Sequence, residues 1–504
     1  MLISRLKHFP FSHFVRRFSY TAINKTEKQR LSFEDPESIY KGKKTWELGR
    51  AYLVFSLCGI KMLMENNQTM MKVGKMILGD KIFGKLMKLT FYGHFVGGEN
   101  EEDLEPLIKE MKELGVDSIM DYSVEEDIDR VEGVMGNGSH KKNECREFFY
   151  QGEEACDKNT EMFLKSIDMV ADATDGEGFS ALKMTALGRP EILLRMSEIE
   201  EAKQFYIRIM EKEGMRIDGD RYKTFHVHNL ESGKMEPLLT GDDGGSLMEP
   251  QEEQFINMVA RLHRVFSYAK SRKVRVMVDA EQSFYQPAIN SLTLEMMKMY
   301  NTEEVVVFNT YQCYLREAFS SIVHDLEQAR RQNFYFGAKL VRGAYMDQER
   351  ELAMALGYED LINVYYEATT ITYCRVLSKC LDTIRDLKQA GEDPKKVQVM
   401  VASHNEDTVR YTIEKMEELG IQQVEKTVSF AQLLGMSDHV TFPLGEAGYM
   451  VYKYVPYGPV MKVLPYLSRR VTENGSMLSN LGLEKKFLGR EIWRRIKTGR
   501  PWTQ

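Results

Sequence analysis

Eight short apolar segments, separated by long amphipathic stretches, constrain the fold of this chain most strongly. They begin after residue 115 and are rich in Val, Ile, Phe and Met. Strands that are apolar along their whole length are typical of a parallel sheet covered by helices. Eight such units predict a closed (βα)8 barrel of the TIM type, with a doubly wound open sheet as the alternative. The expected strands span residues 118–122, 179–185, 274–279, 305–309, 336–341, 397–402, 426–430 and 450–455.

Other segments flank or interrupt this repeat. Residues 26–115 predict an N-terminal helical region, because apolar and Met-rich turns recur there at helical spacing. The barrel is expected over residues 116–480, followed by a C-terminal helical tail over 481–504. Residues 211–250 are polar and glycine-rich, so we expect them to form an excursion from the barrel.

The first 26 residues differ from the rest of the chain. They contain no acidic residue, whereas Arg5, Lys7, Arg16, Arg17 and Lys25 are basic. A secretory signal needs a continuous apolar core, which is absent here because His8, Pro10 and His13 interrupt the apolar residues. Residues 1–25 therefore predict a mitochondrial transit peptide, and a disordered basic tail is the alternative.

Bulk properties exclude several other classes of protein. The net charge of -7 gives no reason to expect nucleic acid as a partner. The six cysteines lie far apart, which favours reduced thiols in an intracellular compartment. The longest apolar stretch, residues 51–63, is too short to span a bilayer.

Polar side chains follow or end most of the expected strands. The carboxyl ends of parallel strands in a barrel meet at one face, where active sites of such folds lie. Each residue taken alone has a structural explanation as a satisfied polar group, but the repetition favours a site. The residues are Lys183, Asp279, Asn309, Lys339, Arg342, His404, Asn405, Gln432 and Tyr454.

A helix expected over residues 459–478 carries the strongest local feature. Tyr466, Arg469, Arg470 and Glu473 are spaced at i, i+3, i+4 and i+7, which places them along one helix face. Two arginines at the mouth of a barrel would bind a carboxylate or phosphate, because guanidinium groups bind such anions bidentately. A solvated face on which an arginine pairs with Glu473 explains the spacing equally well.

Six ordered motifs resemble those of the mitochondrial proline dehydrogenases, within a similarity that runs from about residue 45 to residue 475. They span residues 183–190, 278–281, 309–312, 339–345, 402–405 and 466–470. The resemblance implies a distorted (βα)8 barrel that binds FAD non-covalently. It also implies oxidation of L-proline to Δ1-pyrroline-5-carboxylate in the mitochondrial matrix, with electrons passed to quinone at the inner membrane.

The resemblance implies a role for individual residues. The proline carboxylate would be held by Lys183, Arg469 and Arg470. The ring would be enclosed by Tyr345, Leu433, Tyr454 and Tyr466, above Asp279 on the floor of the site. Glu125 would be the gate partner of an active-site arginine. Lys339 would be a cation near the isoalloxazine edge. The flavin or its tail would be contacted by Ala280, Asn309, Lys339, Val341, Gly343, Ala344, Thr369, Thr370, Ser403, His404, Asn405, Gln432 and Glu473.

Three alternatives to proline oxidation remain open from the sequence. In relatives that act on hydroxyproline the position of Tyr454 is typically serine, so tyrosine favours proline. A barrel lyase would use Lys183 or Lys339 as a Schiff-base nucleophile, and a binding protein would use neither lysine for catalysis. The membrane contact that a quinone acceptor requires falls either on the N-terminal helical region or on the polar insertion.

Overall fold

The computed structural model describes residues 31–123, 152–174, 178–200, 249–357, 359–476 and 478–499. The chain divides into a leading segment, Met1–Ser32, and one unit, Phe33–Gln504, to which the description below applies. The expected transit peptide, Glu125 and residues 211–248 of the polar insertion lie outside the described residues.

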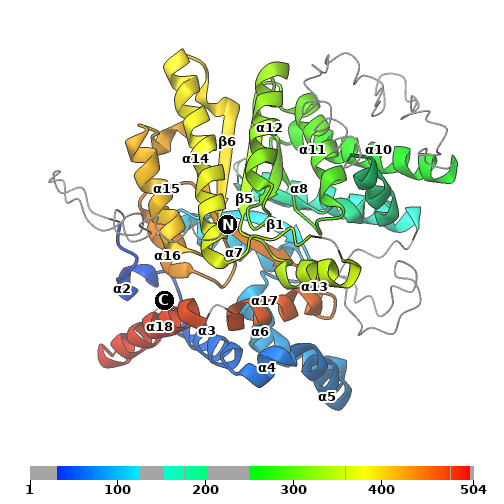
Figure 1. Ribbon diagram of the computed structural model, residues 1–504. Helices are drawn as coiled ribbons and strands as arrows, with labels where there is room; N and C mark the ends of the chain where they lie inside the picture. The colour runs from blue at the N-terminus through cyan, green and yellow to red at the C-terminus, as the bar shows by residue number, and fades with distance from the viewer. Residues whose placement is uncertain are drawn as a thin grey trace, which may run out of the picture. The chain divides into compact units, whose positions relative to one another are not determined.

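Eight parallel strands close into a barrel in chain order (Figure 1). The first strand pairs with the last, with Ile119 opposite Tyr454, so no sheet edge is left open. The prediction of a (βα)8 barrel is confirmed, and the doubly wound open sheet is wrong because that sheet would have two edges. The strands are β1 (Asp117–Tyr122), β2 (Phe179–Leu182), β3 (Arg275–Val278), β4 (Val307–Gln312), β5 (Phe336–Val341), β6 (Val397–Ala402), β7 (Val428–Leu433) and β8 (Val451–Tyr457).

Helices follow the strands and surround the barrel (Figure 1). Apart from α13, they bury apolar side chains toward the barrel or toward neighbouring helices. These helices are α8 (Glu153–Thr174), α10 (Glu249–Ser271), α11 (Gln286–Tyr300), α12 (Ala318–Gln332), α13 (Met346–Leu356), α14 (Tyr366–Ala390), α15 (Glu406–Glu418) and α16 (Asp438–Glu446).

Five strands, β2, β3, β4, β7 and β8, end at different residues than the apolar pattern predicts. β3, β7 and β8 end at Val278, Leu433 and Tyr457, instead of at residues 279, 430 and 455. β2 stops at Leu182, and a 3-10 turn occupies Met184–Ala186. This turn is fixed because the backbone N–H of Thr185 donates to the buried carboxylate of Glu281 at 3.1 Å. β4 continues to Gln312, where its polar side chain is buried against the loop after β3. The ends of β2 and β4 depend on contacts between segments that are distant in sequence.

The lower part of the barrel interior is filled by apolar side chains. The ring of Phe179 lies edge-on to the rings of Phe308 and Tyr452, at centroid distances of 5.1 and 5.0 Å. Side chains two positions apart on a strand share a face. The apolar layer contains Ile119, Ala181, Met277 and Tyr452. Two positions further along the same strands, toward the carboxyl ends, the inward side chains are those of Asp121, Lys183, Asp279 and Tyr454, respectively. An apolar layer therefore supports a polar layer at the face where the sequence places the site.

The chain ends form a second helical layer below the barrel in the view of Figure 1. Helices from both ends of the chain contribute to one apolar cluster, which contains Phe55, Phe95, Leu467 and Leu488. Arg495 ties the two ends together, because its guanidinium donates to the carbonyls of Tyr40 and Lys43. The helices of this layer are α2 (Pro36–Ile39), α3 (Thr45–Cys58), α4 (Lys61–Glu65), α5 (Asn67–Leu89), α6 (Phe91–Phe95), α17 (Leu464–Ser476) and α18 (Leu478–Lys497). Helix α7 (Glu101–Glu113) packs against β1 and α8 instead.

Candidate functional site

Asp279 is the centre of a buried polar group at the carboxyl ends of the strands. The ammonium of Lys339, on β5, donates to Oδ1 of Asp279. The hydroxyl of Tyr454, on β8, donates to Oδ2 at 2.7 Å. The Lys339 ammonium also lies 5.7 Å from the centre of the Tyr454 ring. One carboxylate thus links residues of β5 and β8, which are not neighbouring strands. The sequence predicted these residues only as separate strand-end positions.

The environment of Tyr454 keeps its hydroxyl protonated. Burial raises the pKa of Tyr454 well above its usual value, and the carboxylates of Asp121 and Asp279 raise it further. The phenol therefore acts as a hydrogen-bond donor at all pH values at which the fold is stable. The same electrostatic coupling includes Tyr466, so α17 lies close to this group.

Asp121 is a site residue that the sequence analysis did not single out. It lies at the end of β1 with 3% of its surface exposed, and its carboxylate is 3.9 Å from the ammonium of Lys183. The hydroxyl of Ser123 donates to its other oxygen. A carboxylate near the carboxyl end of β1, two positions after Ile119 and so on the same face of the strand, was the signal that could have identified it.

Helix α17 is inserted into the protein rather than solvated. Tyr466 is 3% exposed and Arg470 is 5% exposed. The Arg470 guanidinium lies 4.9 Å from the centre of the Tyr466 ring, and that of Arg469 lies 6.0 Å from it. Leu433, from β7, packs against the apolar cluster that contains Tyr466. A solvated helix face therefore does not describe Tyr466 or Arg470.

His404 brings the end of β6 close to the same helix. Its Nδ1 lies 3.0 Å from the hydroxyl of Ser437. Burial lowers the pKa of His404 to about 3, and the charges of Lys453 and Arg470 lower it further. The imidazole is therefore neutral at physiological pH. A neutral ring near Arg470 leaves the positive charge there available for an anion.

The end of β5 forms a second cluster, in which Arg342 is central. Its Nη2 donates to the hydroxyl of Thr370 at 2.8 Å, and its guanidinium stacks 4.4 Å from the centre of the Tyr366 ring. Its Nη1 is buried and has no hydrogen-bond partner among the described residues. Arg342 was predicted at the end of β5 but not among the flavin contacts.

Gly343 follows Arg342 with a backbone conformation that favours glycine, at φ 147°. A Cβ atom there would lie 1.6 Å from Cδ1 of Tyr314, so any side chain would require the loop to move. A buried donor next to a glycine backbone is the kind of cradle that holds a phosphate or a flat ring system. Asn405 lies beside this cluster, because its side chain donates to the hydroxyl of Tyr366 at 3.1 Å.

Two expected flavin contacts have protein partners in this structure. The side chain of Asn309 is fully buried and donates to Asn290 on α11 at 3.0 Å. The side chain of Gln432 donates to the carbonyl of Ser403 at 3.2 Å and accepts from Thr441 at 2.9 Å. Both residues belong to strand positions that point away from the polar layer, since their neighbours point inward.

The remaining predicted residues lie at the ends of these strands or on the loops and helices that follow them. Ala280 follows Asp279, Val341 ends β5, and Ala344 precedes Tyr345 at the start of α13. Thr369 is buried in α14, 3.5 Å from the side-chain nitrogen of Asn363. The side chain of Glu473, on α17, is outside the described residues, so its role stays a prediction.

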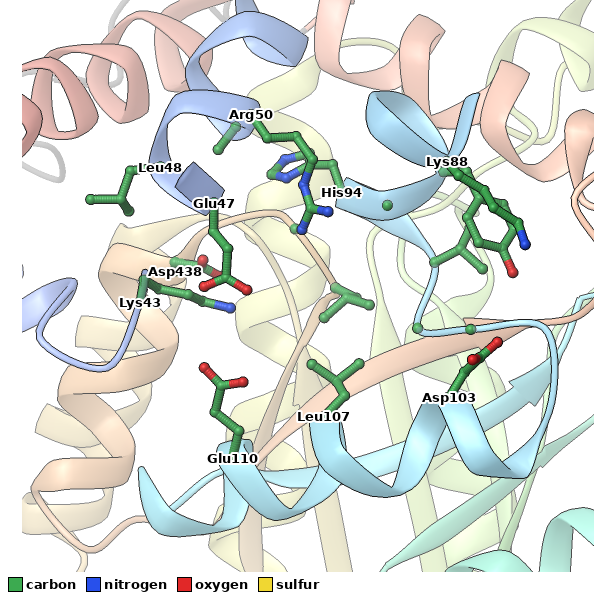
Figure 2. Close-up of a pocket in the computed structure, with 18 of the residues that line it drawn as sticks. Lys43, Glu47, Leu48, Arg50, Lys88, His94, Asp103, Leu107, Glu110 and Asp438 are labelled. Carbon is green, nitrogen blue, oxygen red and sulfur yellow. The ribbon is translucent and has the colours of Figure 1, made fainter. Parts of the chain in front are cut away.

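A cavity of about 420 Å³ lies away from the polar layer, between α3, α6, α7 and the turn after β7 (Figure 2). Charged residues of both signs line it, including Arg50, Glu110 and Asp438. Figure 2 shows Arg50 next to His94. None of the residues predicted for the site lines this cavity. It is therefore separate from the group around Asp279.

Comparison with known proteins gives a consistent family. Residues 141–482 match the family model described as Proline dehydrogenase. The chain is 42% identical to Proline dehydrogenase 1, mitochondrial, of Drosophila melanogaster, over 93% of this chain and 81% of the relative. It is 39% identical to the protein of the same name from Homo sapiens, over 93% of this chain and 90% of the relative. Hydroxyproline dehydrogenase of Xenopus laevis is 35% identical, over 94% and 92%.

A solved structure shares the fold at low sequence identity. It is proline utilization A from Bdellovibrio bacteriovorus, with a TM-score of 0.58 and 17% identity, over 90% of this chain. The chain spans 42% of the length of that protein. This likeness supports the barrel architecture alone.

Proposed function

The chain belongs to the proline dehydrogenase family, and from that premise we propose that it uses FAD to oxidise L-proline to Δ1-pyrroline-5-carboxylate. The observation that carries the proposal is the Asp279 carboxylate, which joins Lys339 and Tyr454 at the mouth of the barrel. Tyr466 on α17 interacts electrostatically with Tyr454, and the Arg470 guanidinium lies 4.9 Å from the centre of the Tyr466 ring. A small anionic ring compound fits such a mixture of cations and aromatic walls.

The residues present fit a flavin. A bound flavin would supply the hydride acceptor, which no side chain of the protein provides. Arg342 offers a buried donor for a phosphate or ring oxygen, and Gly343 allows close approach of the backbone. Lys339 offers a fixed positive charge, because it is held in the barrel by Asp279. Such a cation stabilises negative charge that develops on a reduced ring system.

The substrate carboxylate would bind to the cations on the other side of the mouth. Arg469 and Arg470 would provide guanidinium groups for bidentate hydrogen bonds. Lys183 would add a third positive charge, held in place by Asp121 at 3.9 Å. The role proposed for Asp121 is to position Lys183, since the carboxylate itself would repel the carboxylate of the substrate.

The amine of the substrate must be neutral before it can release hydride. Activity is therefore expected to rise with pH toward the pKa of the amine of the substrate, and a flat rate from neutral to mildly alkaline pH contradicts this mechanism. The phenol of Tyr454 stays protonated over that range, because burial raises its pKa well above its usual value.

Proline is favoured over hydroxyproline as substrate by Tyr454. Its ring occupies the barrel mouth and its hydroxyl is bound to Asp279, which leaves less room for a hydroxylated ring. Hydroxyproline remains the second candidate, because relatives named hydroxyproline dehydrogenase match most of the chain. The comparison of kcat/KM for proline and for hydroxyproline with a quinone analogue decides between them.

A Schiff-base lyase is disfavoured by the surroundings of the two lysines. A Schiff-base nucleophile must be an uncharged amine. Lys339 lies against Asp279, and Lys183 lies near Asp121. Each carboxylate favours an ammonium group, which is suited to binding anions rather than to attacking a carbonyl.

We place the proposed reaction in the mitochondrial matrix, with quinone of the inner membrane as the electron acceptor. The expected transit peptide supports this location, and so do relatives that are named mitochondrial. Among the described helices, none has the length and apolar character needed to cross a bilayer. We propose that the contact with the inner membrane is peripheral.

A spectroscopic experiment tests the proposal as a whole. The purified chain should be yellow, with the absorption of a flavin, and anaerobic addition of L-proline should bleach it. A matched sample treated with D-proline serves as the control for stereospecific binding. A colourless protein that cannot take up FAD contradicts the proposal, as does a flavoprotein whose spectrum proline leaves unchanged.

A further inference from the structure

Helix α5 (Asn67–Leu89) exposes an unusual number of apolar side chains. Large apolar residues in a soluble protein are mostly buried, and extended exposed apolar patches mark interaction surfaces. In α5 only Phe83 and Met87 are buried apolar residues. Eight large apolar side chains of this one helix are exposed: Met70, Val73, Met76, Ile77, Leu78, Ile82, Leu86 and Leu89.

The second half of α5 presents three different faces. Phe83 and Met87, four residues apart, point into the apolar cluster shared by the chain ends. Ile82, Leu86 and Leu89, at i, i+4 and i+7, form an exposed stripe, in which Ile82 is 61% and Leu89 is 73% exposed. Because Phe83 and Met87 are buried in the cluster, the helix is held in an orientation that leaves the stripe of Ile82, Leu86 and Leu89 exposed.

Lysines occupy the third face of this half. Lys81, Lys85 and Lys88 recur at i, i+4 and i+7, one position before Ile82, Leu86 and Leu89. That register places Lys81 and Lys85 along one edge of the apolar stripe. The ammonium of Lys88 donates to the carboxylate of Glu99 instead. Long lysine side chains at such an edge can lie along apolar surface while their charges reach polar headgroups.

The first half of α5 also has an exposed apolar stripe, but its lysines lie on nearly the opposite side of the helix from that stripe. Met70, Val73 and Ile77 form an apolar stripe at i, i+3 and i+7, and Lys72 and Lys75 lie on another face of the helix. The two halves meet at Gly79, whose φ of 70° breaks the helix. With five lysines and one aspartate, α5 is strongly basic in a chain whose net charge is -7.

Neighbouring helices extend the exposed apolar surface. α18, α3, α4 and α5 follow one another along the lower edge in Figure 1, and consecutive members are in contact. Trp46 on α3, Met62 on α4 and Trp493 on α18 are each more than half exposed. Tryptophan is enriched where proteins meet the interface of a bilayer.

Helix α5 is also attached to the helix that carries the proposed carboxylate site. The side chain of Asn67, at the start of α5, donates to Thr472 of α17 at 3.1 Å and accepts from Ser468 of α17. Asn67 and Ser468 are both buried. A surface that binds α5 therefore lies next to the helix that carries Tyr466 and Arg470.

We propose that α5 docks on an anionic phospholipid bilayer, with its apolar stripes inserted at the interface and Lys81 and Lys85 among the headgroups. An amphipathic, lysine-rich helix with large apolar residues lies in the plane of a membrane surface, and anionic lipids attract basic segments. A second copy of the chain is the less suitable occupant, because lysine is depleted at the buried core of protein interfaces. The docked helix would hold α17 close to an acceptor dissolved in the membrane. That consequence rests on the proposed function, whereas lipid binding does not.

Vesicle flotation of the full chain tests this surface. The wild-type protein should float with vesicles of phosphatidylcholine and phosphatidylglycerol in equal amounts. The triple variant Ile77→Ser/Ile82→Ser/Leu86→Ser should bind about tenfold more weakly or worse, since each lost apolar side chain removes buried area at the interface. The variant Lys81→Glu/Lys85→Glu should lose the preference for anionic over purely zwitterionic vesicles.

A matched control separates this site from general surface effects. Met354→Ser/Val424→Ser removes two side chains that are 85% and 79% exposed elsewhere on the protein, and its vesicle binding should equal that of the wild type. All these positions are exposed, so the variants should keep the circular dichroism and thermal transition of the wild type. The triple variant should keep its turnover with a water-soluble dye acceptor and lose turnover with quinone in vesicles.

Three outcomes overturn the proposal. The first is a wild-type chain that does not float with anionic vesicles, and the second is a triple variant that floats as well as the wild type. The third is a wild-type dimer, measured by light scattering, that the triple variant converts to monomers without any change in vesicle binding. A chain that floats as expected but reduces neither acceptor with proline refutes the proposed function and leaves the docking surface intact.

Discussion

The hydroxyl of Tyr454 donates a 2.7 Å hydrogen bond to the carboxylate of Asp279, which also accepts from the ammonium of Lys339. The three residues lie on β8, after β3 and on β5, so the bond network crosses the mouth of the barrel. It fixes the ring of Tyr454 beside the place proposed for the substrate ring.

Replacing Tyr454 by serine should shift the substrate preference toward hydroxyproline. The change removes the ring wall and opens space, so the ratio of kcat/KM for proline to that for hydroxyproline should fall by roughly tenfold or more. Tyr454→Phe is the control, because it keeps the ring and removes only the hydrogen bond to Asp279. An unchanged ratio in Tyr454→Ser would show that this position does not select the substrate.

Replacing Asp279 by asparagine should lower kcat/KM for proline by about a hundredfold or more, because breaking one partner from a buried ion pair leaves the charge of Lys339 uncompensated. Steady-state kinetics with a dye acceptor measures the effect. Asp325→Asn is a matched control: Asp325 is also buried and accepts from a tyrosine hydroxyl, that of Tyr311, at 2.7 Å. Equal losses of activity in both variants would assign the effect to stability rather than to the site.

Replacing Arg470 by lysine should raise the KM for proline by about tenfold or more, because a single ammonium cannot reproduce the two parallel hydrogen bonds of a guanidinium. Pyrrolidine lacks the carboxylate, so its turnover should be much less affected. The surface variant Arg410→Lys, which alters an ion pair with Glu406, should leave both values unchanged. A normal KM for proline in Arg470→Lys contradicts the proposed carboxylate site.

Replacing Arg342 by methionine should weaken FAD binding by about tenfold, since a charge-assisted hydrogen bond to the cofactor would be lost. Titration of the flavin-free protein, followed by flavin fluorescence, measures the dissociation constant. Arg375→Met is the control, because its guanidinium stacks on Phe319 on the outside of the barrel. Retention of flavin equal to that of the wild type would exclude Arg342 from the cofactor site.

The folded protein should lose stability steeply as the pH falls below about 6.5. Burial lowers the pKa of His94 and His404 to about 3 and that of His439 to about 4. In this range the unfolded chain binds protons that the folded chain does not, so acid favours unfolding. Each histidine should contribute about 1.4 kcal/mol per pH unit below its unfolded pKa.

Thermal unfolding between pH 4 and pH 7 checks this pH dependence. His439→Gln should reduce the slope of the melting temperature against pH, because one of the three buried histidines is removed. His324→Gln is the control, since His324 lies at an exposed hydrogen bond on α12. A wild-type melting temperature that stays constant from pH 7 to pH 4 would contradict the prediction.

The sequence alone was sufficient to predict the barrel, because its strands are short and apolar and each is followed by a helix. β5 and β6 have the predicted ends, since their apolar runs coincide with the strand pairing. The strand-end positions of Asp279, Lys339 and Tyr454 were also apparent, because the carboxyl ends of parallel strands meet at one face.

Only the tertiary structure determined which of these polar residues touch one another. Asp121 looked like an ordinary strand residue until the inward register placed it near Lys183. The spacing of Tyr466 and Arg470 fitted both a solvated helix face and an anion site, and the burial of these two side chains excludes a solvated position for either of them. Periodicity within a segment reports which face a side chain occupies, whereas contact and burial depend on segments that only folding brings together.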